Sequence, residues 1–216
     1  MNKEKRAFNF EIRAEKNEQH GFFIAGTPIV FDQDTDMGWY QERIDHQALA
    51  GADLKDVMFL VGHDTSMIPL ARSRNNNENS TMQMSVTDAG MEIRVDLDVE
   101  NNPRAAELYS AVKRGDISGM SFMFIVDKDS WEDIESDYPK RTILAISKVF
   151  EVSATAFPAY PQTNIQAASE DASLDSARVS LESAKQKLQE EREAEAYQER
   201  RTALLERLNN LTKEEK

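Results

Sequence analysis

The chain has 216 residues, about one and a half domains of ordinary size. Its 39 acidic and 26 basic residues give a formal net charge of -13, which argues against a surface built to neutralise nucleic acid phosphates. Because the chain contains no cysteine, disulfides, thiolate metal sites and a cysteine nucleophile are excluded. No segment approaches the roughly 18 consecutive apolar residues of a membrane-spanning helix. We therefore expect neither a membrane nor a nucleic acid partner.

Residues 1–166 repeatedly show the alternation of apolar and polar side chains that is typical of β-strands. In chain order, the expected strands are Phe8–Ala14, Gly21–Phe31, Val57–Val61, a hairpin of Met82–Val86 and Met91–Leu97, Met120–Val126 and Thr142–Phe157. Polar loops are expected at Asp32–Gly38, Arg72–Ser80 and Asp127–Lys140. Strands and helices do not alternate regularly, so the pattern favours a mainly β, α+β fold closed or nearly closed into a barrel over a parallel sheet.

Two helices are expected within this part of the chain. A short one begins near Asp45. A clearer one follows Asn102, with Pro103 at the first helical position and Gly115 as the terminating residue, the arrangement that helix ends favour.

Residues 167–216 differ in kind, because they contain neither glycine nor proline. Leu174, Leu181 and Leu188 recur at a spacing of seven residues, which predicts a long, charged helix. Such a helix is either solvated on its own or paired with another chain, since polar helices gain little stability alone. We therefore divide the chain into a β domain, residues 1–166, and a helical tail, residues 167–216.

Three residues of the β domain suggest acid–base and nucleophilic chemistry. His63 is one of only three histidines, with His20 and His46, and it follows the apolar strand Val57–Val61. Ser121 begins a later strand. Glu151 lies in a strand that is apolar on both faces, where a carboxylate needs a hydrogen-bond donor. A serine, a histidine and an acid can form a catalytic triad, although each of these residues could equally be structural.

Other kinds of site have weaker support. A metal site of His46, His63 and Asp64 lacks a recognisable ligand spacing. The alternating acids of Asp32–Asp36 resemble a calcium loop, but Arg43 stands where that loop requires a glutamate. No glycine-rich phosphate loop occurs. We therefore expect no metal and no cofactor.

Several motifs in order resemble a known family. They are Gly62-His63-Asp64, Asp88-Ala-Gly90, Glu107–Gly115, Ile117–Phe122, and Phe150–Ser153 followed by Phe157–Tyr160. Together they resemble the prohead maturation proteases of tailed phages, which are serine peptidases related to the herpesvirus assemblins. The resemblance covers about Phe8 to Thr163.

This resemblance implies an assemblin-like, orthogonally packed β-barrel surrounded by helices. It also implies that His63 is the general base, Ser121 the nucleophile and Glu151 the acid, with Asp64 as the less favoured candidate for that third position. Gly62 and Met123 depart from the residues that the family often has there, asparagine and glycine. The donors of the oxyanion hole are not identified.

The same resemblance implies a serine endopeptidase that cleaves the capsid protein, scaffold segments and itself inside the procapsid assembling in the host cytoplasm. The tail would then be a scaffold-like element that directs the protease into the shell, through a dimer or a larger oligomer, and is removed by self-cleavage near Gln166–Ser169. Two rivals remain: a non-catalytic capsid-assembly or scaffolding protein that keeps the fold, and a metal-dependent hydrolase that uses His46 and His63.

Overall fold

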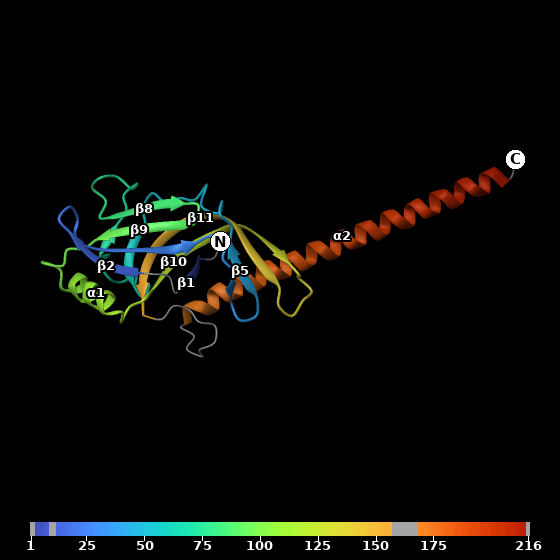
Figure 1. The fold of residues 1–216 in the computed structure, drawn as a ribbon. Coiled ribbons are helices and arrows are strands. Elements are labelled where there is room, and N and C mark those ends of the chain that lie inside the picture. Colours follow the sequence, from blue (N-terminus) through green and yellow to red (C-terminus); the bar gives the residue numbers. More distant parts are fainter. Residues whose placement is uncertain (1–2, 9–11, 157–167, 215–216) are drawn as a thin grey trace. The chain divides into compact units, whose positions relative to one another are not determined.

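The computed structural model describes residues 3–8, 12–156 and 168–214 (Figure 1). Its contacts divide the chain into two compact units, Met1–Ser176 and Ala177–Lys216. In chain order, the elements are β1 (Lys3–Phe8), β2 (Ile12–Asn17), β3 (Gly21–Val30), β4 (Thr35–Asp36), β5 (Gln41–Ile44), β6 (Met58–Val61), β7 (Ala71–Arg72), β8 (Met82–Thr87), β9 (Gly90–Asp96), α1 (Pro103–Arg114), β10 (Gly119–Glu132), β11 (Lys140–Thr155) and α2 (Ala168–Glu214). Among the described residues, no helix is both long and apolar enough to cross a membrane.

The described strands pair into two sheets. The larger sheet follows the order β1-β10-β11-β5-β4, with β6 paired to β11 and β7 to β6, and the smaller sheet follows β2-β3-β9-β8. The predicted mainly β, α+β class with a long C-terminal helix is therefore confirmed. The predicted closed barrel is not observed among the described residues, because β1 joins the larger sheet and β2 the smaller one, so the N-terminal alternation continues across two separate sheets.

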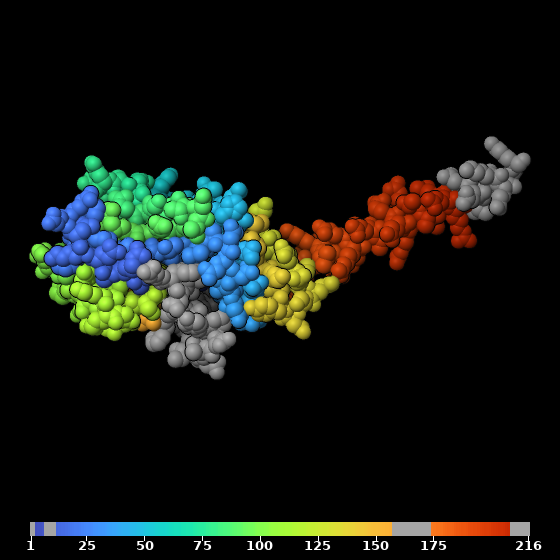
Figure 2. All heavy atoms as spheres, viewed as in Figure 1, coloured from blue at the N-terminus to red at the C-terminus, as the bar shows by residue number. Residues whose placement is uncertain are grey.

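The core is apolar and lies where β10 of the larger sheet packs against β3 of the smaller one. Helix α1 packs against β2, and the space-filling view shows the two side by side (Figure 2). The predicted start and end of α1 are confirmed: the Asn102 side chain accepts from the Arg104 N–H, Pro103 is at the start, and Gly115 ends the helix with a φ of 81°. That positive φ is the reason glycine suits the position. The face of α1 that enters the core consists of Ala105, Leu108 and Val112.

Two predictions of local structure are wrong. The helix expected near Asp45 is a series of tight turns, in which the N–H groups of Ala48, Ala50 and Ala52 each bond to the carbonyl three residues earlier. The loop expected at 127–140 is largely strand, because β10 continues to Glu132 and pairs with β11 from Lys140. Backbone pairing with β11 outweighs the polar composition of this hairpin.

A buried cluster of charges ties β1 to the interior of the larger sheet. Its members are Glu4 and Arg6 of β1, Glu42 of β5 and Arg141 of β11, each at most 2% exposed. Arg6 binds both glutamates, and the Arg141 Nη1 lies 2.9 Å from Glu4 Oε2 and 3.1 Å from Glu42 Oε2. Burial alone would raise the pKa of Glu4, but the positive charges of Arg6 and Arg141 outweigh it and lower that pKa. The two arginines therefore balance two buried carboxylates.

Removing one partner of this cluster should be costly. Replacing Arg141 by methionine leaves Glu4 and Glu42 with one buried cation fewer, and Asp129 loses its 2.7 Å contact with the Arg141 Nε. We expect a loss of about 3–5 kcal/mol in the free energy of unfolding, measured from urea denaturation curves.

The matched control is Arg72→Met. Arg72 also binds a carboxylate, that of Asp56 at 2.6 Å, but their side chains are 43% and 49% exposed. We expect this change to cost less than about 1 kcal/mol. Equal effects of the two substitutions would contradict a structural role for the buried cluster.

Candidate active site

The end of β6 turns the chain sharply and aims His63 back toward β11. Gly62 and His63 both have a φ of 61°, in the left-handed region. For a residue other than glycine this conformation costs about 1–2 kcal/mol. The turn is held by a backbone hydrogen bond of 3.0 Å from the Gly62 N–H to the Ala154 carbonyl of β11. The strained position of His63 is thus fixed by the neighbouring strand.

The imidazole of His63 meets the carboxylate of Glu151. The His63 Nδ1 lies 2.5 Å from the Glu151 Oε1, and Glu151 is fully buried whereas the His63 side chain is 14% exposed. Against an ionised carboxylate, which can only accept a hydrogen bond, a neutral imidazole carries its proton on the Nδ1 and leaves a lone pair on the Nε2. The structure therefore brings together two of the three predicted residues, the histidine and the acid.

Ser153 holds this pair in place. Its Oγ donates to the Glu151 Oε2 at 2.6 Å and accepts from the His63 backbone N–H at 3.0 Å. The single hydroxyl thereby orients both the acid and the backbone of the histidine. Sequence reasoning missed Ser153 as a site residue. Ser153 follows Glu151 by two residues in β11, so the alternation of side chains along the strand places both on the same face.

Ser121 lies on this same face, one strand away. It is directly opposite Ser153 in the antiparallel pairing of β10 with β11, so their Cβ atoms are roughly 4.5–5.5 Å apart. Ser121 is fully buried, and its Oγ donates to the Arg6 carbonyl of β1 at 2.7 Å. Within the described residues, no hydrogen bond joins Ser121 to His63.

Asp64, the other acid considered for the third position, points elsewhere. Its Oδ1 accepts from the Ser66 hydroxyl at 2.6 Å and from the Ser66 backbone N–H at 2.9 Å. These bonds lower the pKa of Asp64. Asp64 therefore stabilises the turn after His63, while Glu151 contacts the imidazole.

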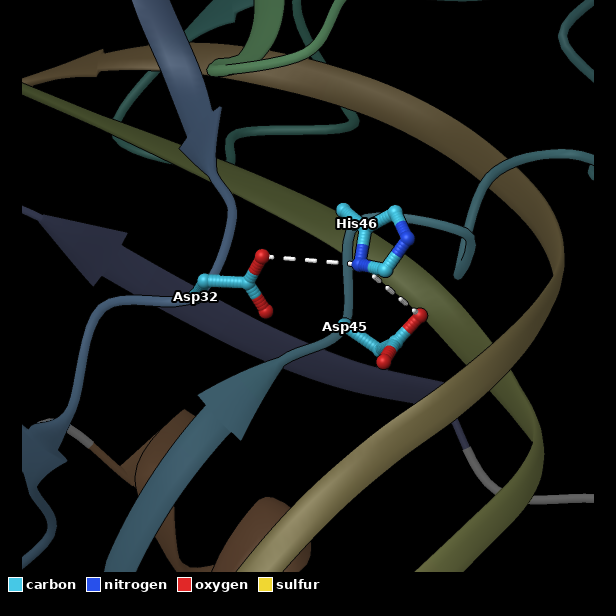
Figure 3. A group of neighbouring side chains, drawn as sticks. All are labelled: Asp32, Asp45 and His46. Carbon is cyan, nitrogen blue, oxygen red and sulfur yellow. Dashed lines mark ion pairs between the residues drawn. The ribbon is translucent and has the colours of Figure 1, made fainter.

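His46, considered above as a metal ligand with His63, belongs to a different group. Figure 3 shows it between Asp32 and Asp45, with its Nδ1 3.5 Å from the Asp32 Oδ2 and 3.8 Å from the Asp45 Oδ1. Potential ligand atoms of the three residues lie within 4.8 Å of one another. The His46 and Asp32 side chains are 55% and 53% exposed. The ring of His63 contacts Glu151 instead, so the structure does not show the two histidines as one ligand set.

Comparison with known proteins points to one family. Residues 8–176 match the sequence model of the family described as Caudovirus prohead serine protease. No curated protein sequence matches the chain. A solved structure, that of the bacteriophage T4 capsid assembly protease, is similar with a TM-score of 0.34 and 12% identity over 70% of this chain and 98% of that one.

Proposed function

Since the chain belongs to the Caudovirus prohead serine protease family, we propose that it is a serine endopeptidase with His63, Ser121 and Glu151 as its catalytic triad. The observation that carries this proposal is the 2.5 Å contact between the His63 Nδ1 and the Glu151 Oε1. A fully buried carboxylate bonded to a histidine, on the sheet face that also carries a serine, is the arrangement that this chemistry requires.

The proposed reaction has two halves, formation of an acyl-enzyme and its hydrolysis, and the three side chains take part in both. The Ser121 Oγ attacks the carbonyl carbon of the peptide bond, while its proton passes to the His63 Nε2. Glu151 stabilises the imidazolium that forms, without taking its proton. The tetrahedral intermediate then collapses to an acyl-enzyme, and His63 gives the proton to the leaving amine. Water, activated by the same histidine, hydrolyses the acyl-enzyme and restores Ser121.

This reaction requires the Ser121 hydroxyl to change partner. The hydroxyl now donates its proton in a hydrogen bond to the Arg6 carbonyl, and it must point to the His63 Nε2 before attack. Rotation about the Cα–Cβ bond exchanges the two acceptors, because a serine hydroxyl has three staggered positions. The hydrogen bond that is given up has a net worth of about 1 kcal/mol, a small part of a catalytic barrier.

The proposed substrates are the capsid protein, scaffold segments and the chain itself, cleaved within the assembling procapsid in the host. Membership of a prohead protease family supports this assignment. The 47-residue helix α2 gives the chain an extended element beyond its β domain. We propose that residues 167–216 act as a scaffold-like tail, pairing through the leucine spacing seen in the sequence.

Self-cleavage is proposed near Gln166–Ser169, the junction between the two parts of the chain. Gln166 and Ala167 lie outside the described residues, and α2 begins at Ala168. Small side chains suit a narrow cleavage pocket, and a bond that precedes the helix can be cut without unwinding it. The products would be the β domain and a free tail.

One observation favours the alternative, a non-catalytic capsid-assembly protein that retains the fold. The Ser121 Oγ donates to a backbone carbonyl of the same chain and not to His63. In a purely structural protein, this bond would be the permanent role of the hydroxyl.

A serine-directed reagent separates the two functions. We expect diisopropyl fluorophosphate to phosphorylate the Ser121 Oγ, with loss of fluoride, because His63 can accept the proton of that hydroxyl. The modified peptide is identified by mass spectrometry, and loss of the tail from the full chain is followed on a gel.

Two controls accompany this experiment. A metal chelator should leave the rate of tail loss unchanged. If the protein were a metal-dependent hydrolase, the chelator would stop tail loss. Denatured protein should take up no reagent, since the reaction depends on the folded site. Labelling of Ser153 in place of Ser121, or no labelling of a chain that still loses its tail, would overturn the assignment of the nucleophile.

A further inference from the structure

Thr155, the last residue of β11, carries a buried hydroxyl without a partner. The residue is 8% exposed, and its Oγ1 has no hydrogen-bond partner in the described structure. Buried polar atoms in folded proteins are nearly always paired, and one that is left unpaired lowers stability. The stability of the fold therefore does not explain why a hydroxyl is present at this position.

The hydroxyl lies on the face that carries the proposed triad. Side chains alternate along β11, so Thr155 shares a face with Ser153 and Glu151. In the pairing with β10, Thr155 is opposite Gly119 and Ser153 is opposite Ser121, with no irregularity at this end of the ladder. Thr155 is thus a diagonal neighbour of Ser121, with their Cβ atoms about 7–8 Å apart.

The residue opposite Thr155 on β10 is buried and adds no side chain beside the hydroxyl. Gly119 has no side chain, so nothing on β10 fills the position opposite the Thr155 hydroxyl. A carbonyl group whose carbon lies about 3 Å from a nucleophile is placed for attack. A carbonyl held in that way by Ser121 can direct its oxygen along the sheet toward Thr155.

We propose that the Thr155 hydroxyl donates a hydrogen bond to the substrate carbonyl oxygen and stabilises the oxyanion that forms there. The inference rests on the proposed function and adds a catalytic residue to it. When the Ser121 Oγ bonds to the carbonyl carbon, the π electrons of the C=O bond move to the oxygen. Thr155 keeps its proton and donates a hydrogen bond to this negative charge, which strengthens as the charge develops. When the intermediate collapses, the electrons return and the amine leaves with the proton from His63.

The fold alone would be better served by valine at this position. Valine has nearly the same shape as threonine, favours strands equally well and brings no unpaired hydroxyl into the interior. Retaining the hydroxyl costs stability, and within the part of the chain that the structure describes it makes no hydrogen bond in return. This combination is expected of a group whose partner is supplied only by the substrate.

The test compares Thr155→Val with Thr155→Ser in the full chain. p-Nitrophenyl acetate serves as the acyl donor, and nitrophenolate release gives kcat and KM. We expect the valine variant to lose about 10²–10³-fold in kcat, as for the removal of one oxyanion donor, with KM changed less than about threefold. Its urea midpoint should be equal to or higher than that of the wild type. The serine variant, which keeps the donor, should recover most of the activity.

The possible results separate this inference from the proposed function. A valine variant that keeps its kcat within about threefold overturns the role of Thr155 and leaves the triad intact. A variant that loses stability together with activity shows a structural hydroxyl, and the inference is equally wrong. If the wild type shows no hydrolysis that depends on Ser121, the proposed function itself fails, and the role of Thr155 fails with it.

Discussion

Replacing Ser121 by alanine is expected to lower kcat by about five to six orders of magnitude, the loss seen when a triad serine is removed. The full chain should then keep its tail during incubation. Alanine has no atom that can attack a carbonyl carbon, and the proposed base and acid cannot compensate, because the residues of a catalytic triad act as a unit. The measurement is the rate of tail loss on a gel, with the cleavage site read by mass spectrometry.

The fold of this variant should survive. Within the described residues, the Ser121 Oγ donates to the Arg6 carbonyl at 2.7 Å, and the loss of this hydrogen bond costs about 1 kcal/mol. The urea midpoint of Ser121→Ala should therefore fall only slightly. A variant that unfolds would say nothing about chemistry, which is why stability is measured on the same preparation.

The matched control is Ser130→Ala, near the other end of β10. Ser130 pairs with Thr142 and lies outside the part of the strand that faces His63 and Glu151. Its loss should leave the rate within about threefold of the wild type. If Ser121→Ala were trimmed as fast as Ser130→Ala, Ser121 would not be the nucleophile and the non-catalytic alternative would gain support.

The candidate site could be predicted in part because its residues stand out against their surroundings in the chain. Glu151 is one of only two charged residues, with Lys148, in the predicted strand Thr142–Phe157, and His63 comes just after an apolar strand. Burial of Glu151 and its contact with His63 agree with that reasoning. Gly62, the residue before His63, has a positive φ, as the sharp turn at this position requires.

Other features could not be predicted, because they depend on distant pairing. The salt bridge of Arg6 with Glu42 joins two residues that are 36 positions apart in the chain, and neither residue lies in an informative local pattern. Ser153 has no distinguishing feature in the sequence, and its role becomes visible only from its contacts with His63 and Glu151. The hairpin at 127–140 has the composition of a loop, and only its pairing with β11 makes it a strand.

The sheets show the same limit. Alternation of side chains predicted strands correctly at β3 and at the hairpin of β8 and β9. It carries no information on which strands become neighbours. The parallel pairing of β6 with β11, which brings His63 to Glu151, arises from tertiary packing.

A second large effect is expected from Glu151→Gln, which keeps the shape of the side chain and removes its charge. The carboxylate now accepts from the His63 Nδ1 at 2.5 Å and from the Ser153 Oγ at 2.6 Å. An amide has only one oxygen to accept with. Either its NH2 group faces the imidazole and forces the proton onto the Nε2, or it faces Ser153 and leaves that hydroxyl without its acceptor.

The first orientation produces the wrong tautomer for a general base, and both orientations remove the charge that stabilises the imidazolium. We therefore expect kcat to fall about 10⁴-fold, with KM nearly unchanged, because Glu151 is buried behind His63 and is not placed to contact the substrate. Kinetics with p-nitrophenyl acetate and the rate of tail loss give two measurements of the same change.

Asp64→Asn is the control that decides between the two candidate acids. Asp64 bonds to Ser66 at the surface of the turn, so its amide variant should keep activity within about threefold. The opposite outcome, near-normal turnover in Glu151→Gln and a large loss in Asp64→Asn, would transfer the third role to Asp64. It would also require the turn after His63 to rearrange. Of the two candidate acids, Glu151 is the one that contacts the imidazole Nδ1 in the described structure. A hydrogen bond at the Nδ1 sets which ring nitrogen carries the proton, and Glu151 is the acid placed to accept it.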